Sequence, residues 1–347
     1  MRLPYTEFFA TYEVVAPFRI PAHPGSLWRG VIGRAFRREG CAQQRVCQDV
    51  CQLDSECLYR KLFDPPMPQP APHRFLRGQK EAPPPLLPLM SWSGNQLLEV
   101  GDSLRIGLRC LGNITAREKE CLGNVLRAIP NARLGRDGGQ VDLVSMFDPL
   151  VDAKSASARD SLAMARDSLS ARIRLQTPLW LEQDGQLLTQ IPFAQLFTFL
   201  MRRLTTLCSL YGVHDPDDDA QFLSLRAIAE QVSVTGSRLI PLHWERHSWE
   251  SDVRHPLHGV IGELTLHGPL LPLLPFLRMA EIAHLGKSTS FGLGHMQIEL
   301  LQGPAQPHAA TQLPEGISHA ERGIATSGAI AQTVDWRTKE NQAYCTR

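Results

Sequence analysis

The stretch HLGKSTSFGLGH, residues 284–295, decides the fold because it places a glycine-rich loop between a predicted helix and a predicted strand. Leu273 and Leu277 lie at helical spacing before it, and residues 296–300 alternate between apolar and polar after it. Its Gly-Lys-Ser-Thr segment also occurs in nucleotide-binding P-loops, but a P-loop runs from strand to helix and has a glycine where this chain has Glu281. The loop is therefore not a P-loop, and its glycines need another explanation.

Composition limits the class of protein. The 347 residues suffice for about two domains, and a hydrophobic content of 43% supports packed cores. Lys and Arg number 36 against 35 Asp and Glu, so a nucleic-acid site must come from local clustering of charge. No apolar run reaches the ~18 residues of a membrane span, and the N-terminus lacks the apolar segment of a signal peptide. We therefore expect a cytoplasmic protein with reduced thiols and no membrane association.

Residues 24–39 predict an amphipathic helix after an opening strand. The face opposite its apolar side holds two glycines and three arginines: Gly30, Gly33, Arg29, Arg34 and Arg37. Glycine costs a helix interior about 1 kcal/mol relative to alanine, so a close approach to this face is expected. Either a phosphate chain approaches it, or another helix packs there and the arginines are solvated.

The order of predicted elements is that of a ferredoxin-like domain, and it occurs twice. In the first half it comprises strand 7–20, helix 24–39, strands within 95–113, helix 115–130 and strand 140–148. In the second half it comprises strand 170–183, helix 192–212, an acidic turn 214–220, strands 237–248 and 257–268, a leucine-rich helix and a last strand. No repeat with a fixed period accompanies this order.

We predict an α+β fold of two tandem ferredoxin-like domains. The first spans residues 1–150 and contains a cysteine- and proline-rich, loop-like insertion at about 40–92. The second spans 170–302 and carries the glycine-rich loop. Residues 303–347 are rich in small and polar residues without periodicity, which predicts a flexible tail or linker.

Four cysteines of the insertion form a C-x5-C-x3-C-x5-C array, and they are Cys41, Cys47, Cys51 and Cys57. Four thiolates could close a tetrahedral zinc site, which would be structural because no position stays open for water. The array lacks the C-x2-C pairs typical of zinc sites. Three further cysteines lie in apolar periodic segments and are expected in the core: Cys110, Cys121 and Cys208.

Four features in this order resemble the CRISPR pre-crRNA processing endoribonucleases of the RAMP superfamily. They are PGSLWRGVIGRAFRRE after the first strand, the cysteine-rich insertion ending in CLYRKLFDP, TPLWL in the second half, and WERHSWESDVRHPLHGVIGELTLHG leading to the glycine-rich loop. The resemblance covers residues 5–301. It implies two ferredoxin-like domains that bind a CRISPR repeat RNA and cut it once per repeat.

The resemblance also implies the chemistry. The ribose 2′-hydroxyl attacks the adjacent phosphate without a metal ion and leaves a 2′,3′-cyclic phosphate and a 5′-hydroxyl. The reaction needs a base, an acid and cations for the developing charge. In the family the glycine-rich loop lies at the cleft between the domains and touches the RNA backbone. The implied RNA-binding residues are Arg29, Arg34, Arg37, Gly286, Ser288, Thr289, Gly292 and Gly294; alternatively, the glycines only form a tight turn.

The base in many relatives is a histidine in or beside the first helix. This helix has none, and the nearest is His23, which could otherwise be an ordinary loop residue. His284 and Lys287 belong to the loop motif, where a cation could steady the phosphate, and Arg246 lies in a second polar segment. Some relatives rely on arginines instead of a histidine. The remaining histidines are expected to be structural or on the surface: His255, His258, His267 and His295.

The sequence leaves three alternative functions open. The first is the processing ribonuclease, and the second is a non-catalytic RAMP-fold subunit that binds RNA in a CRISPR effector or adaptation complex. The third is a zinc-containing RNA- or protein-binding module organised by the cysteines. Because relatives are sometimes joined to reverse transcriptase and integrase modules, such a module or effector subunits are candidate partners besides the RNA.

Overall fold

The two halves of the chain form two antiparallel sheets with the same strand order. The structure is a computed structural model that describes residues 1–41, 57–90, 96–147, 154–157, 168–247 and 254–301. The N-terminal sheet has the order β3-β5-β1-β6 and the C-terminal sheet the order β11-β12-β8-β13. Numbered within each half, both orders are 2-3-1-4, the order of a β-α-β-β-α-β ferredoxin-like unit. The predicted duplication is therefore confirmed by topology.

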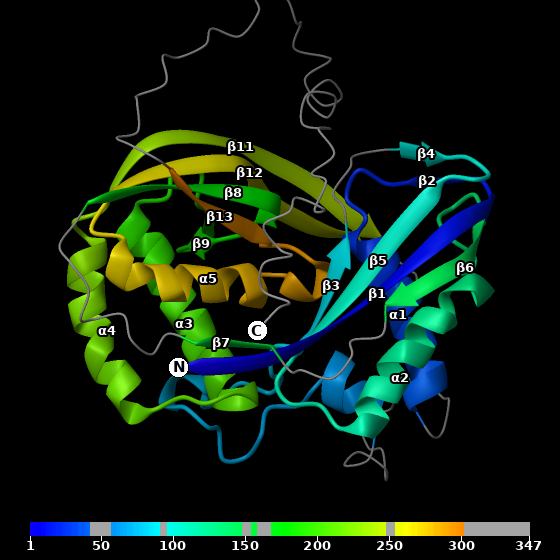
Figure 1. The fold of residues 1–347 in the computed structure, drawn as a ribbon, viewed down its shortest axis with the longest axis horizontal. Coiled ribbons are helices and arrows are strands. Elements are labelled where there is room, and N and C mark those ends of the chain that lie inside the picture. Colours follow the sequence, from blue (N-terminus) through cyan, green and yellow to red (C-terminus); the bar gives the residue numbers. More distant parts are fainter. Residues whose placement is uncertain (42–56, 91–95, 148–153, 158–167, 248–253, 302–347) are drawn as a thin grey trace, which may run out of the picture.

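The helices lie on one face of each sheet (Figure 1). Those of the first half are α1 (Gly25–Gly40) and α2 (Ala116–Arg127), and those of the second half are α3 (Phe193–Tyr211), α4 (Pro216–Ala229) and α5 (Leu274–Ala283). The N-terminal strands are β1 (Arg2–Ala16), β3 (Leu86–Met90), β5 (Ser103–Leu111), β6 (Gln140–Phe147) and β7 (Lys154–Ser157), with a separate ribbon of β2 (Phe18–Ile20) and β4 (Gln96–Leu98). The C-terminal strands are β8 (Leu169–Leu179), β11 (Ser233–His247), β12 (Arg254–Gly268) and β13 (Met296–Leu301), with a ribbon of β9 (Glu182–Gln183) and β10 (Gln186–Leu187).

Two segments contain elements that the sequence did not predict. β3 lies inside the segment expected to be loop-like, because Pro88 is tolerated in a strand at the sheet edge. The expected acidic turn 214–220 contains the start of α4, because carboxylates such as Asp217 and Asp219 favour the first turn of a helix. In addition, β7 lies beyond residue 150 and still pairs with β1.

The two halves share an apolar contact. Leu3, Leu87 and Leu111, from the N-terminal sheet, belong to the same buried cluster as Leu204 of α3. The other large core packs α1 and α2 against the N-terminal sheet. Cys110, Cys121 and Cys208 are buried, as predicted. Among the described helices, none is long and apolar enough to cross a membrane.

Candidate functional site

The glycine-rich loop is attached to the end of β8 by main-chain hydrogen bonds. The amide of Lys287 donates to the carbonyl of Trp180 at 2.9 Å, and that of Gly294 donates to the carbonyl of Pro178 at 2.9 Å. The Thr177 hydroxyl donates to the carbonyl of Gly292 at 2.8 Å and accepts from the amide of the following loop residue His295. The TPLWL segment is therefore the surface on which the loop folds.

The loop glycines are required by contacts within the protein. Gly286, Gly292 and Gly294 have φ angles of 91°, 79° and 73°, which L side chains rarely adopt. A Cβ atom at Gly294 would lie 1.7 Å from the carbonyl oxygen of Leu285, and one at Gly286 would lie 2.5 Å from that of Trp180. These close approaches are made by backbone of the same chain, so the structural explanation of the glycines holds without RNA.

A sharp test of this packing is Gly294→Ala. We expect it to lower the free energy of unfolding by about 2–5 kcal/mol, because a left-handed backbone and a displaced carbonyl are both costly. Gly185→Ala is the matched control, since Gly185 has a φ of 77° and nothing within 4 Å of its Cβ position. It should lose only about 1–2 kcal/mol. Equal losses in urea unfolding of the two variants would contradict the tight loop.

The loop also contacts the N-terminal domain. The carbonyl oxygen of Phe291 would lie 2.2 Å from a Cβ at Gly25, where α1 begins. Arg29 lies over the Phe63 ring at 4.3 Å and the Phe291 ring at 5.1 Å, and it donates to the carbonyl of Ser290 at 3.5 Å. The loop therefore lies at the junction of the two domains, as the resemblance implied.

Two loop residues predicted to act on RNA are buried. His284 is 1% exposed, stacks on His295 with ring centroids 4.7 Å apart, and lies 3.2 Å from the carbonyl of Leu293 through Nδ1. Burial lowers the pKa of His284 well below its usual value and that of His295 to about 4. Thr289 is 5% exposed and accepts a hydrogen bond from Arg203. The burial of His284 and Thr289 therefore favours a role in positioning the loop over direct contact with RNA.

Lys287 is exposed and paired with a carboxylate. Its Nζ contacts Glu182 and lies 5.5 Å from the centre of the Trp180 ring. The indole of Trp180 donates to Glu182, and hydrogen bonding from Lys287 holds the pKa of Glu182 below its usual value. A pocket of about 170 Å³ lies beside this pair. This volume is below the about 300–1,000 Å³ that is typical of pockets for small ligands.

Two histidines adjoin this pair, and one of them, His258, was expected to be structural or on the surface. His258 lies edge-on to the Trp180 ring at 5.5 Å, and its Nδ1 is 2.8 Å from Nδ1 of His243 on the neighbouring strand. Strand register places the two imidazoles opposite each other. Because β8 lies far in sequence from β11 and β12, the pairing of β8 with β12 is needed to place Trp180 beside the two histidines.

His23 lies at the same junction from the other domain. Its ring stacks on that of Trp244 in β11, with centroids 4.2 Å apart. Burial lowers the pKa of His23 to about 4, so the imidazole is neutral near pH 7. His23 lies two residues before Gly25, the glycine that contacts the loop. The segment that contains His23 therefore meets both the loop and β11.

The predicted arginine face of α1 is only partly open. Gly33 is buried, and a Cβ there would lie 2.8 Å from the Phe63 ring, so this glycine serves packing. Arg34 is exposed, and Arg37 lies 5.1 Å from the centre of the Tyr59 ring. Arg34 and Arg37 stay candidates for phosphate contacts, and the role of Arg246 stays a prediction because its side chain lies outside the described residues.

The ends of the cysteine array lie together. Cys41 and Cys57 are buried and interact through their side chains. Burial raises the pKa of the Cys57 thiol, which disfavours its thiolate in the absence of a metal. Cys47 and Cys51 lie outside the described residues, so the zinc site stays a prediction.

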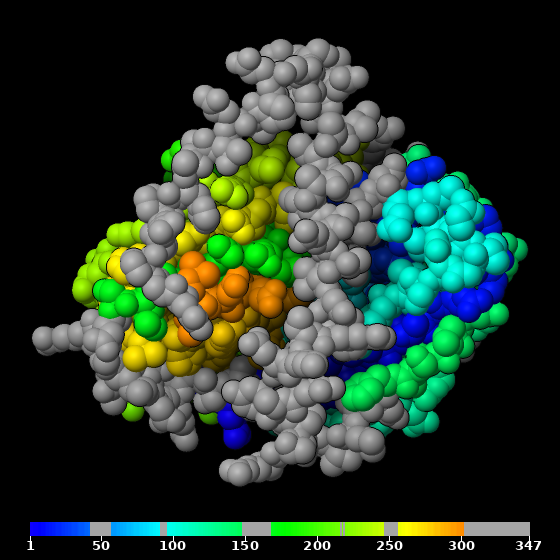
Figure 2. Space-filling model, turned by 45° about the horizontal axis from the view of Figure 1, so that its top comes forward, coloured from blue at the N-terminus to red at the C-terminus, as the bar shows by residue number. Residues whose placement is uncertain are grey.

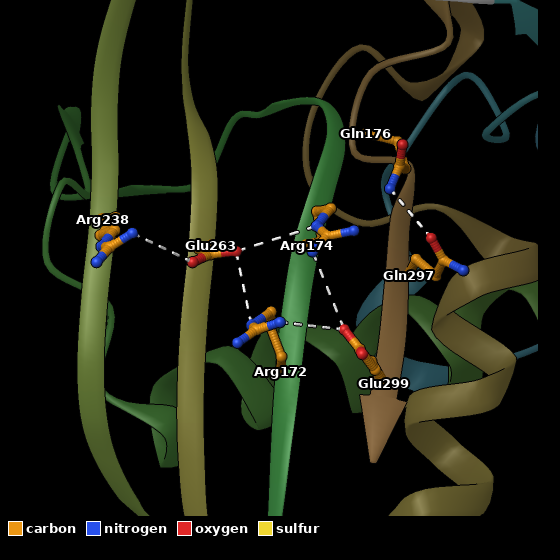
Figure 3. A network of polar contacts seen from close by, with 7 residues as sticks. All are labelled: Arg172, Arg174, Gln176, Arg238, Glu263, Gln297 and Glu299. Atoms are coloured by element: carbon orange, nitrogen blue, oxygen red, sulfur yellow. Dashed lines mark hydrogen bonds and ion pairs between the residues drawn. The ribbon is translucent and has the colours of Figure 1, made fainter. Parts of the chain in front are cut away.

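The open face of the C-terminal sheet carries a polar network (Figure 3). We call its charged part the ion-pair ladder, which consists of Arg172, Arg174, Arg238, Glu263 and Glu299. Its distances range from 3.3 Å, between Arg172 and Glu299, to 4.0 Å. Figure 2 shows β8 and β13 at the surface on this side, with the N-terminal domain to the right.

Two ferredoxin-like domains with a glycine-rich loop at their junction are the arrangement that the resemblance to RAMP proteins implied. Family models match both halves of the chain. The model of the CRISPR-associated endoribonuclease Cas6 matches residues 173–296, and a model described as an N-terminal domain matches residues 3–163. A search of curated proteins found no significant match.

Solved structures have the same fold. A Cas6 product complex is 17% identical with a TM-score of 0.50, and the match covers 85% of this chain and 100% of that one. A partial Cas6-RT-Cas1–Cas2 complex is 12% identical with a TM-score of 0.53 over 88% of this chain, and a second Cas6-RT-Cas1–Cas2 complex gives the same values. This chain spans 47% and 30% of the two chains in those complexes. Residues 173–296 are therefore similar to the Cas6 family, and the fold of the chain is that of Cas6 structures.

Proposed function

We propose that this chain binds the repeat RNA of CRISPR precursor transcripts and cleaves it once per repeat. The attacking group is the ribose 2′-hydroxyl, and the products carry a 2′,3′-cyclic phosphate and a 5′-hydroxyl. The match to the Cas6 endoribonuclease model supports a ribonuclease, because the matched residues 173–296 include the glycine-rich loop. The observation that carries the proposal is the contact of Phe291 with Gly25, which brings the segment of His23 to that loop.

His23 is the proposed base. Because its pKa is lowered to about 4, the imidazole is unprotonated near pH 7 and can accept the proton of the 2′-hydroxyl. Lys287 supplies an exposed cation in the loop, and Arg246 is proposed to add a second. His284, which is buried, would act only by holding the loop in place.

The test uses purified protein, EDTA and a labelled repeat RNA from the same locus. A matched RNA carries a single 2′-deoxy substitution at the cut position. We expect one cut per repeat in the first RNA, none in the second, and a cyclic phosphate at the new 3′ end. Tight binding without cleavage would replace this proposal with the non-catalytic RNA-binding subunit, and cleavage of the deoxy RNA would exclude attack by the 2′-hydroxyl.

We also propose a partner, a reverse transcriptase–integrase module. The similarity to Cas6-RT-Cas1–Cas2 complexes over 88% of this chain supports it. Co-purification with tagged reverse transcriptase and integrase proteins from the same locus tests this assembly. Separate elution at all salt concentrations would contradict it.

A further inference from the structure

His73, His214 and Asp219 form a cluster far in sequence from the glycine-rich loop. Asp219 lies in the first turn of α4, and His214 lies two residues before that helix begins at Pro216. His73 comes from the proline-rich segment of the N-terminal half, just before the short 3-10 helix Arg74–Leu76. A hydrogen bond of 3.1 Å between Nε2 of His73 and the carboxylate of Asp219 therefore joins two segments that are 146 residues apart in the sequence.

Both segments are held in place by packing. Leu76 is 2% exposed and lies in a small apolar cluster with Met67 and Ala82, against which Leu210 at the end of α3 packs. The residue before His214, Val213, is fixed by two main-chain hydrogen bonds to Arg2, at 2.8 and 2.9 Å. The side chains that converge here therefore start from a fixed backbone.

The geometry of the cluster suits a metal ion. The three potential ligand atoms lie within 4.8 Å of one another. Nε2 of His73 is 3.1 Å from one carboxylate oxygen of Asp219, and Nε2 of His214 is 3.4 Å from the other. Zinc–ligand bonds of about 2.0–2.1 Å in a tetrahedron put the ligand atoms about 3.3 Å apart, close to these separations.

Hydrogen bonding alone does not account for the cluster. Both imidazoles are only 10% exposed, whereas Asp219 is 45% exposed. The buried Nε2 of His214 faces the carboxylate yet has no hydrogen-bond partner among the described residues. A buried nitrogen without a partner costs free energy, and a bound cation would satisfy it and the carboxylate together.

We propose that His73, His214 and Asp219 bind one divalent transition-metal ion, with zinc as the fitting ion. Imidazole and carboxylate ligands are typical of zinc, and water would complete a tetrahedron with three protein ligands. The ion would join the proline-rich segment to the start of α4 and stabilise the contact between the two halves. This site is separate from the cysteine array and from the residues proposed for RNA cleavage.

The test is metal binding by the full chain after treatment with a chelator. We expect the stripped protein to take up zinc, and its thermal unfolding temperature to rise with zinc concentration. Asp219→Asn keeps the shape of an exposed side chain and removes a ligand, and it should weaken zinc binding at this site by more than about tenfold. His214→Gln should do the same. His267→Gln is the matched control, because His267 contacts Ser170 at 3.1 Å and lies outside the cluster.

Cobalt separates this site from the cysteines. In a protein with Cys47 and Cys51 replaced by serine, Co²⁺ should still give the absorption of a nitrogen- and oxygen-ligated ion, without a thiolate charge-transfer band. That absorption should disappear in the same protein with Asp219→Asn. The proposal is overturned if Asp219→Asn and His267→Gln bind zinc equally well, or if all metal uptake is lost with the cysteines. In either case the cluster would be an ordinary contact of two histidines with an aspartate.

Discussion

His23→Ala is expected to slow cleavage of repeat RNA by about 10²–10⁴-fold, the usual contribution of a general base. RNA affinity should change little, because the imidazole is uncharged near pH 7. The measurement is single-turnover cleavage with saturating protein, together with binding to the uncleavable 2′-deoxy RNA. His267→Ala serves as the control, since His267 is partly buried on β12, away from the junction.

The pH profile gives a second readout. Protonation inactivates a base, so activity is lost as pH falls through its pKa, which for His23 is about 4 instead of the usual 6.5. Cleavage by the unmodified protein should therefore stay constant from about pH 8 down to about pH 5. Trp244→Ala removes the ring stacked on His23 and should raise this pKa, which moves the loss of activity to higher pH. Full activity of His23→Ala would contradict the proposal that His23 is the base, and the neighbouring histidines His243 and His258 would be the next candidates.

Arg109→Ala is expected to lower the free energy of unfolding by about 3–5 kcal/mol, the cost of removing one partner from a buried ion pair. Arg109 is 8% exposed on β5 and donates to Glu7 at 2.7 and 2.9 Å. Its other nitrogen donates to the carbonyls of Glu281 and Ile282, at 2.9 and 2.8 Å, where α5 ends. Alanine would leave the Glu7 carboxylate and both carbonyls without this donor.

Urea unfolding measures this loss, and Arg238→Ala is its control. Arg238 is 58% exposed and 3.9 Å from Glu263, so its removal should cost about 1 kcal/mol or less. The double variant Arg109→Met with Glu7→Leu should recover part of the stability, because no buried charge is then left alone. A loss from Arg109→Ala as small as that from Arg238→Ala would mean that this arginine does not hold the two halves together.

The sequence predicted the elements whose signals are local. The apolar periodicity of α1 and α3 was sufficient to predict one helix in each half. The glycine-rich loop before β13 was sufficient to predict the order helix, loop, strand at the end of the second half. β3 was missed because Pro88 argues against a strand unless the strand is known to be an edge. The start of α4 was missed because its aspartates are equally typical of a turn.

The sequence predicted where the candidate site lies, but only some of the contacts that its side chains make. Glycines with positive φ were expected in the loop, but no sequence signal told whether RNA or the end of β8 approaches them. His284 lies among polar loop residues, yet its side chain is buried. The neighbours of Lys287, such as Glu182 and His258, come from separate strands, so strand pairing had to be known before they could be grouped.

The ion-pair ladder has a consequence for how RNA would be held. Each phosphate neutralised on a single strand contributes about 0.7 to the slope of log affinity against log salt concentration, through release of condensed counterions. The arginines of the ladder already face Glu263 and Glu299, so a strand crossing this sheet would gain little from them. Salt sensitivity should therefore arise mainly from cations such as Arg34 on α1, because the two glutamates of the ladder offset most of the charge of its three arginines.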